Sequence, residues 1–270
     1  MVKKLLKHEL IYYFRSFGLF LPIVLVIAVM ARVFQCFDDS YIINQIIISS
    51  SSGMLLVSCA ALLVLSSVAG IVRFYKNMFS AEGYLTFTLP VTNAEHIFVK
   101  LVAAMICEFV CLLVVLVAAA ISLSGEEYTL FWQRIRYITG MLAENIGPVH
   151  MIGYTLEWVL LVLLSLASTM LLIYSCIAIG QTAKKNRIIK AIGAYFVYYI
   201  ITQVVSTIVT ITIMVLAMSN SLNGILQWVA FHPYATLHMG FCGMILLLTG
   251  LSAAFWAITQ HIMSKKLNLE

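Results

Sequence analysis

The sequence predicts an all-α polytopic membrane protein, and three observations carry this prediction. First, 63% of the 270 residues are hydrophobic and 10% are charged, whereas a soluble domain averages about 25% charged residues. Second, the mean hydropathy is +1.03. Third, apolar runs such as residues 112–123 do not alternate with polar residues, which favours helices over the strands of a membrane β-barrel. We therefore expect a single transmembrane domain over residues 1–270.

A helix that crosses a bilayer needs about 20 mostly apolar residues. Six segments satisfy this requirement, and they cover about 17–34, 51–74, 97–123, 153–181, 188–218 and 234–263. Serines at residues 49–52 are expected to cap the start of the second span. Ser66 and Gly70 in that span form a pair of small residues, which permits a neighbouring helix to approach closely.

The positions of Lys and Arg predict the orientation of the chain. With the N-terminus inside, the outer side holds Arg32, Arg134 and Arg136, and the inner side holds the other thirteen of the sixteen basic residues. Both termini are therefore expected in the cytoplasm, in a multi-pass protein of the cell membrane. The net charge of +5 is explained by this bias and by attraction to anionic lipid, so it calls for no nucleic-acid partner.

Three segments outside the spans have features of their own. Residues 1–16 predict an amphipathic helix in the cytoplasmic interface, because Leu6, Leu10 and Tyr13 recur at helical spacing. The aromatic-rich segment 124–152 predicts a short outer helix that ends at Gly147 and Pro148. Residues 219–233 contain an apolar piece too short to cross, which favours a re-entrant element before the last span.

A polar segment at residues 75–96 lies between the second and third spans and faces the cytoplasm in this topology. It contains FSAEGYLTFTLPVT, residues 79–92. Thr92 or Asn93 is expected to cap the next helix, with Glu95 in its first turn. A solvated loop has no need of so apolar a run, so the segment predicts either a loop folded back on its own helix ends or a docking surface for a soluble protein.

The phrase Phe79–Thr92, followed by Lys100, resembles a stretch of type-2 ATP-binding cassette (ABC-2) exporter permeases from Gram-positive bacteria, and the C-terminal SKKLNLE is similar to endings in that group. The expected architecture resembles theirs over the whole chain. The resemblance implies a coupling helix at about residues 79–84 that inserts into a separate ATPase subunit. The implied ATPase-coupling residues are Phe79, Glu82, Gly83, Tyr84, Leu85 and Phe87.

The same resemblance implies that the chain works as a homodimer or heterodimer of permease chains with two ATPase subunits. Small permeases of this kind export antimicrobial peptides, drugs or lipids, and the sequence does not choose among these substrates. The chain contains no G-x-x-x-x-G-K-[ST] motif, so ATP and Mg²⁺ are expected on the partner subunit rather than here. We expect no cofactor, metal site or enzymatic activity in this chain.

Three polar residues inside the predicted spans are candidate functional groups: Glu108, Glu157 and Gln203. An ionisable side chain at the bilayer centre is costly and should face a partner or water. Glu108 predicts either a structural hydrogen bond to another helix or a role in a translocation path. The second possibility supports an alternative function, a proton-coupled secondary transporter. An intramembrane protease is disfavoured, because Glu127 and Arg134 have the wrong spacing for such a motif.

Overall fold

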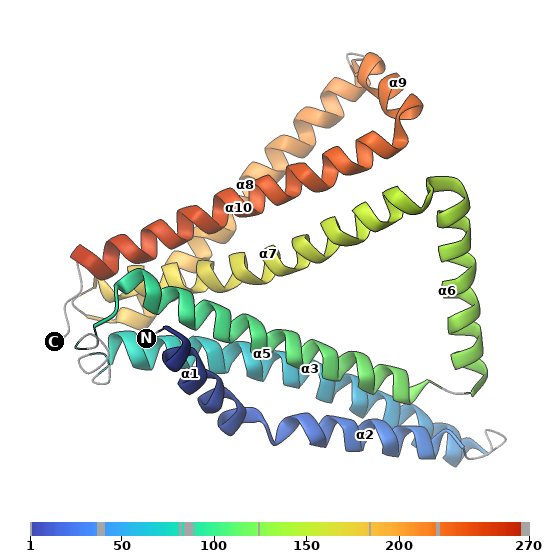
Figure 1. Ribbon diagram of the computed structural model, residues 1–270, viewed down its shortest axis with the longest axis horizontal. Coiled ribbons are helices and arrows are strands. Elements are labelled where there is room, and N and C mark those ends of the chain that lie inside the picture. Colours follow the sequence, from blue (N-terminus) through green and yellow to red (C-terminus); the bar gives the residue numbers. More distant parts are fainter. Residues whose placement is uncertain are drawn as a thin grey trace. The chain divides into compact units, whose positions relative to one another are not determined.

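The computed structural model is built from α-helices throughout the part of the chain that it describes (Figure 1). Described are residues 2–36, 41–80, 83, 88, 90–123, 125–183, 185–219 and 222–265, without the side chains of residues 125–127, 142–146 and 226. The chain divides into two compact units, Met1–Met141 and Leu142–Glu270.

The described part of unit 1 contains four helices that pack on one another and most of a fifth. They are α1 (Val2–Phe17), α2 (Phe20–Phe34), α3 (Ile42–Phe79), α5 (Asn93–Ser122) and most of α6 (Gly125–Ile146). Helices α2, α3 and α5 pack on one another, and α1 packs on both α3 and α5. The axis bends by 44° between α1 and α2, where Gly18 and Leu19 connect the two helices.

Unit 2 is built around α7 (Pro148–Gln181), which packs against α8 (Arg187–Met218) and α10 (Pro233–Lys265). The short helix α9 (Asn223–Phe231) packs on α10. Tyr198 of α8 meets Phe255 of α10 edge to face, with ring centroids 5.3 Å apart. Because α8 returns the chain along α7, the N-terminal ends of α7 and α10 lie together at one end of this unit (Figure 1).

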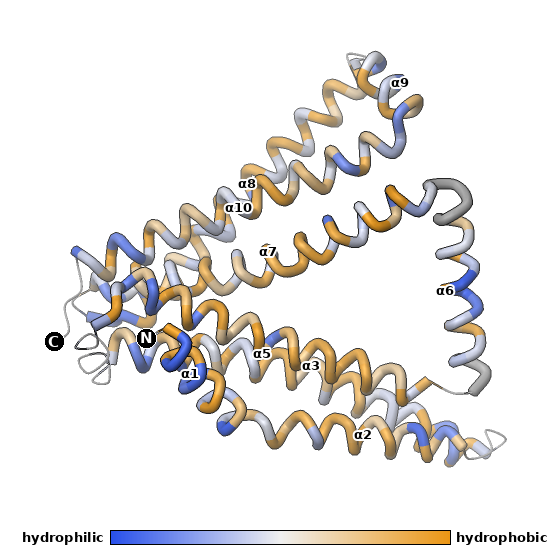
Figure 2. Tube along the Cα trace, in the orientation of Figure 1, coloured by the Kyte–Doolittle hydropathy of each residue, from blue (hydrophilic) through white to orange (hydrophobic). Residues whose placement is uncertain are grey.

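The helix lengths and hydropathies make the chain a multi-pass membrane protein. Helices α3, α5, α7, α8 and α10 are each long and apolar enough to span a bilayer, and the bent pair α1 and α2 raises the number to six if it counts as one span. Figure 2 shows hydrophobic residues along these helices and frequent hydrophilic residues on α1 and α6. Five of the six predicted spans are therefore confirmed as long apolar helices, and the first, predicted at 17–34, is matched only if α1 and α2 count together as one span.

Several helix boundaries differ from the sequence-based prediction. Helix α3 begins at Ile42, so the prediction that the serines at residues 49–52 cap its start is wrong. Ser51 and Ser52 instead donate to the backbone carbonyls three residues before them, which satisfies a hydroxyl inside a helix. The connection between α3 and α5 covers residues 80–92, because both helices extend into the predicted polar segment 75–96.

The helices outside the predicted spans agree with the sequence in part. Helix α6 ends at Ile146 and α7 begins at Pro148, which confirms the predicted break, and Gly147 adopts a positive φ of 80° that favours glycine. At 22 residues α6 is longer than the short helix expected. Residues 219–233 contain the nine-residue helix α9, and its re-entrant position stays a prediction.

Candidate functional site

A buried carboxylate joins three helices of unit 1 at the end where α3 stops and α5 starts. Glu9 of α1 accepts a hydrogen bond from Nε of Arg73 at 2.9 Å and one from Nδ2 of Asn77 at 3.1 Å, both from α3. It also accepts one from Nζ of Lys100 of α5 at 2.9 Å. We call Glu9, Arg73, Asn77 and Lys100 the Glu9 cluster. The cluster connects α1 to α3 and α5, the two helices that flank residues 80–92.

The Glu9 cluster is shielded from solvent and balanced in charge by close contact. The side chains of Glu9 and Lys100 are 6% and 3% exposed, and that of Arg73 is 18% exposed. Burial by itself raises the pKa of Glu9, but the charge of Lys100 and hydrogen bonds from Lys100 and Arg73 outweigh it and hold the pKa below its ordinary value. Glu9 is therefore an ionised carboxylate at neutral pH.

Packing around the Glu9 cluster fixes the position of α1. The guanidinium of Arg73 lies 3.8 Å from the centroid of the Tyr12 ring, a cation–π contact. The next residue of α1, Tyr13, lies one turn after Glu9 and is 1% exposed. A Cβ atom at Gly70 would lie 3.4 Å from the hydroxyl of Tyr13 and 3.7 Å from Cβ of Ala104. The predicted close approach at Ser66 and Gly70 is thus present, with α1 and α5 as the neighbours.

The predicted ATPase-coupling segment follows α3 directly. The ring of Phe79 is buried and meets the ring of Phe74 edge to face at 5.8 Å. Gly83 is buried, and a Cβ atom there would lie 2.9 Å from the carbonyl oxygen of Met78. Of the other predicted coupling residues, Glu82, Tyr84, Leu85 and Phe87 lie outside the described residues. The coupling role of the segment stays a prediction.

The far end of this segment is fixed by a capping box at the start of α5. The hydroxyl of Thr92 accepts from the backbone N–H of Glu95, and Oε2 of Glu95 accepts from the backbone N–H of Thr92 at 2.9 Å. This confirms the predicted capping residue and satisfies two N–H groups that a helix start leaves open. Residues 80–92 are thus held between two well-packed helix ends.

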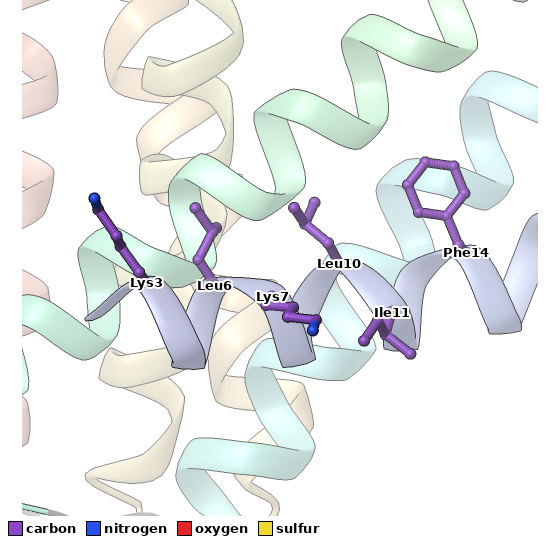
Figure 3. A pocket seen from close by; sticks show the side chains of 6 residues that line it. All are labelled: Lys3, Leu6, Lys7, Leu10, Ile11 and Phe14. Atoms are coloured by element: carbon purple, nitrogen blue, oxygen red, sulfur yellow. The ribbon is translucent and has the colours of Figure 1, made fainter. Parts of the chain in front are cut away.

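The side of α1 next to its buried face is partly exposed. A shallow pocket there is lined by Lys3, Leu6, Lys7, Leu10, Ile11 and Phe14. Figure 3 shows Leu6, Leu10 and Phe14 in a row along the helix, and Ile11 and Phe14 are about half exposed. Apolar side chains beside lysines suit a helix that lies among lipid headgroups.

The three predicted intramembrane polar residues lie in different surroundings. Glu108 of α5 is 7% exposed and accepts a 2.6 Å hydrogen bond from the hydroxyl of Ser67 of α3, which is the interhelical contact that the structural alternative predicts. Glu157 of α7 contacts His238 of α10. Gln203 is exposed on α8, a helix without buried residues. Glu157 and Gln203 both belong to unit 2, and Glu108 belongs to unit 1.

Sequence reasoning missed Glu9 and the pairing of His238 with Glu157. A signal for Glu9 was present, because it precedes Tyr13 by four residues and so lies on the apolar face of α1. An acid on the apolar face of an amphipathic helix predicts a buried basic partner. The partners Arg73 and Lys100 lie far away in sequence and could be counted only as inner-side charges.

Comparison with protein-family models, with curated proteins and with solved structures finds no match to this chain. Within the described part of the chain, no three His, Cys, Asp or Glu side chains gather in a way that could hold a metal ion. The six cysteines are free.

Proposed function

We propose that this chain is the membrane-spanning subunit of an ATP-driven ABC exporter. It would lie in the cell membrane with both termini in the cytoplasm, α1 in the inner interface and six spans. A separate ATPase subunit would bind residues 79–92, and the exported substrate would be hydrophobic or amphipathic: an antimicrobial peptide, a drug or a lipid.

The observation that supports this proposal best is the Glu9 cluster. A coupling segment transmits force only if the helices on either side of it move as one body. Glu9 joins α1 to Arg73, six residues before the end of α3, and to Lys100, seven residues after the start of α5. A push on residues 80–92 would therefore move α1, α3 and α5 together.

The exposed face of α8 supports a second permease chain. Thr202, Gln203, Ser206, Thr207 and Thr210 form a polar stripe, because they recur at helical spacing on one side. The hydroxyls are satisfied by carbonyls of their own helix, as in the 2.8 Å bond from Thr210 to Ser206. The amide of Gln203 is poorly suited to lipid, so this side is better covered by another protein chain or by a water-filled exit path.

The first test is purification of the tagged chain from its native membrane in mild detergent, with mass spectrometry of the proteins that accompany it. We expect a stoichiometric soluble protein with a Walker A motif, and the stoichiometry would also reveal a second permease. A chain that purifies alone, including after cross-linking from residues 79–92, would contradict the proposal.

The coupling role of residues 79–92 is tested by charge reversal. Glu82→Lys should weaken ATPase binding or leave a bound ATPase uncoupled, seen as an altered ATP turnover of the purified complex in nanodiscs. Glu126→Lys is the control, because the proposed topology puts it on the other side of the membrane. Normal coupling in Glu82→Lys would remove this residue from the proposed interface.

The alternative function, a proton-coupled secondary transporter, depends on Glu108. An ionisable side chain inside a span suits a translocation path, whereas the bond that Glu108 accepts from Ser67 is explained by structure alone. Glu108→Gln keeps a hydrogen-bond acceptor for Ser67 but cannot titrate. Proton-driven uptake or efflux by the purified chain without an ATPase, lost in Glu108→Gln, would favour this alternative over the ABC exporter.

A further inference from the structure

A chain of three titratable side chains joins the N-terminal ends of α7 and α10 in unit 2. Nδ1 of His238 lies 2.7 Å from Oε1 of Glu157, and Nε2 of the same ring lies 3.1 Å from Nδ1 of His150. Glu157 and His150 belong to α7, so His238 of α10 is held between two residues of one helix. We call these three residues the histidine clasp.

Aromatic packing holds the histidine clasp in place. The ring of Tyr154 stacks on that of His238 with centroids 4.2 Å apart, and the ring of Tyr234 stacks on that of His150 at 5.5 Å. The hydroxyl of Tyr154 donates to the backbone carbonyl of Tyr234 at 3.0 Å. A Cβ atom at Gly153 would lie 3.1 Å from Cε1 of His238, so the imidazole sits directly against the backbone of α7.

The positive charge opposite Glu157 can come only from histidine within these helices. Helix α7 contains no Lys or Arg, and Lys265 of α10 lies at the other end of that helix. In α8, no titratable side chain follows Tyr199, so the half of this helix nearest the clasp has none. Helix α9 has none either. His232, which follows α9, stacks on Trp228 at 5.0 Å. Among the residues whose side chains the structure describes, the clasp has Tyr154 and Tyr234 as its titratable neighbours.

The hydrogen bonds of the histidine clasp limit how many protons it can hold. With both imidazoles neutral, His238 donates through Nδ1 to Glu157 and accepts through Nε2 from His150. One added proton makes His238 an imidazolium that donates to both neighbours, and the carboxylate neutralises its charge. A second added proton puts N–H groups on both facing nitrogens at 3.1 Å, so the bond between the two rings is lost and two cations face each other.

We propose that the histidine clasp is a proton-binding site that holds α7 and α10 together with up to one added proton and releases them when the second proton binds. Imidazole is the side chain whose ordinary change of charge falls between pH 5 and 8, so a comparison across this interval tests the release. In the topology proposed above, the clasp faces the outside of the cell and responds to external pH. The inference does not depend on the ATPase partner, because it concerns contacts within unit 2.

Hydrogen exchange of the purified full-length chain in nanodiscs tests this proposal. Exchange is followed by mass spectrometry at pH 7.5 and 5.0, with correction for the intrinsic effect of pH on exchange, in peptides that cover residues 152–160 and 237–244. We expect these amides to exchange about tenfold faster at pH 5.0, the factor expected when a contact of about one hydrogen bond is lost from a local opening equilibrium. Helix α3 serves as the internal reference and should not change.

Matched histidine variants identify the histidine that binds the second proton. His150→Gln keeps a side-chain N–H that can donate to His238 but cannot take the second proton, so its exchange should be alike at both pH values. His232→Gln removes a histidine outside the clasp and should behave like the wild type. Gel filtration and thermal unfolding at pH 7.5 identify a variant that fails to fold.

Two results would overturn the proposal. One is equal protection of the wild type at pH 7.5 and 5.0, which requires no variant. The other is the same acid-induced loss of protection in folded His150→Gln, because the second proton would then bind elsewhere. If the pH response is lost in His232→Gln and retained in His150→Gln, the second proton binds at His232, after α9, and the proposal for the clasp is wrong.

Discussion

At the residue scale, the carboxylate of Glu9 connects three helices through one buried group. Its partners are cationic or amide donors at 2.9–3.1 Å, and charge-assisted hydrogen bonds of this kind are stronger than those between neutral groups. A buried ion pair does not by itself stabilise a fold, because desolvation offsets the attraction. Its consequence is specificity of position, since few other placements of α1 leave Lys100 with a carboxylate.

Removing the charge of Glu9 should destabilise the chain strongly. Glu9→Gln leaves Lys100 buried without a carboxylate, and loss of one partner of a buried pair costs about 3–5 kcal/mol. The double variant Glu9→Leu, Lys100→Met should recover much of this loss, because Arg73 is partly exposed and can reach solvent. Thermal unfolding of the purified chain measures both.

The exposed lysine Lys7 provides the control for this prediction, because it lies on the same helix outside the Glu9 cluster. Lys7→Gln should unfold like the wild type. A Glu9→Gln variant as stable as the wild type would show that the Glu9 cluster contributes nothing to the stability of unit 1.

The contribution of Glu9 should depend on pH in strong acid only. Folding lowers the pKa of Glu9 from its ordinary value of 4.5, so the folded chain binds this proton less tightly than the unfolded chain. The stabilisation is then complete above pH 4.5 and is lost as the pH falls through the lower folded value. The difference in unfolding midpoint between wild type and Glu9→Gln should be constant from pH 8 to 5 and shrink below pH 4.5. A difference that vanishes near pH 7 would contradict this.

At the scale of elements, α1 and α3 approach each other closely where Gly70 of α3 faces Tyr13 of α1. Buried Ser66 is one turn away on the same face. Without a strong hydrophobic driving force between helices in lipid, close packing of small residues is a main source of their association. The sequence predicted the pair of small residues Ser66 and Gly70, and the structure identifies α1 and α5 as the helices that approach it.

Enlarging Gly70 should therefore separate α1 from α3. Gly70→Leu would push on Tyr13 and Ala104, and overpacking of this kind typically costs about 1–3 kcal/mol. Gly53→Leu is the matched control in the same helix, because no atom lies within 4 Å of the Cβ position there. Unfolding midpoints in detergent should fall for Gly70→Leu and stay near the wild type for Gly53→Leu. Equal effects of both would rule out the close approach as the cause.

Boundaries of elements were harder to predict than their existence. The continuous apolar runs predicted five of the long helices, since their length and composition suffice. The start of α3 at Ile42 was missed, because the serines at residues 49–52 suit a helix cap and also tolerate the helix interior. The cap of α5 was predicted at Thr92 or Asn93, and the structure places it at Thr92, where Glu95 three residues later completes a capping box.

At the scale of the whole molecule, the proposed orientation can be tested with a native cysteine. Cys36 is exposed just after α2, whereas the other five cysteines lie within candidate spans. A membrane-impermeant maleimide should label the wild type in intact cells, and Cys36→Ser should abolish the labelling. Labelling that requires lysis of the cells would invert the proposed orientation.

The sequence by itself determined the class of the molecule: a helical chain with several long apolar spans, an amphipathic first helix and a polar segment between two long helices. These features follow from composition, run length and local capping, which need no knowledge of distant contacts. Only the tertiary structure decided that Glu9 meets Arg73 and Lys100, that Glu108 bonds to Ser67, and that His238 lies between Glu157 and His150. Each of these contacts joins residues more than 40 positions apart, and their pairing depends on how the helices pack, which no local pattern records.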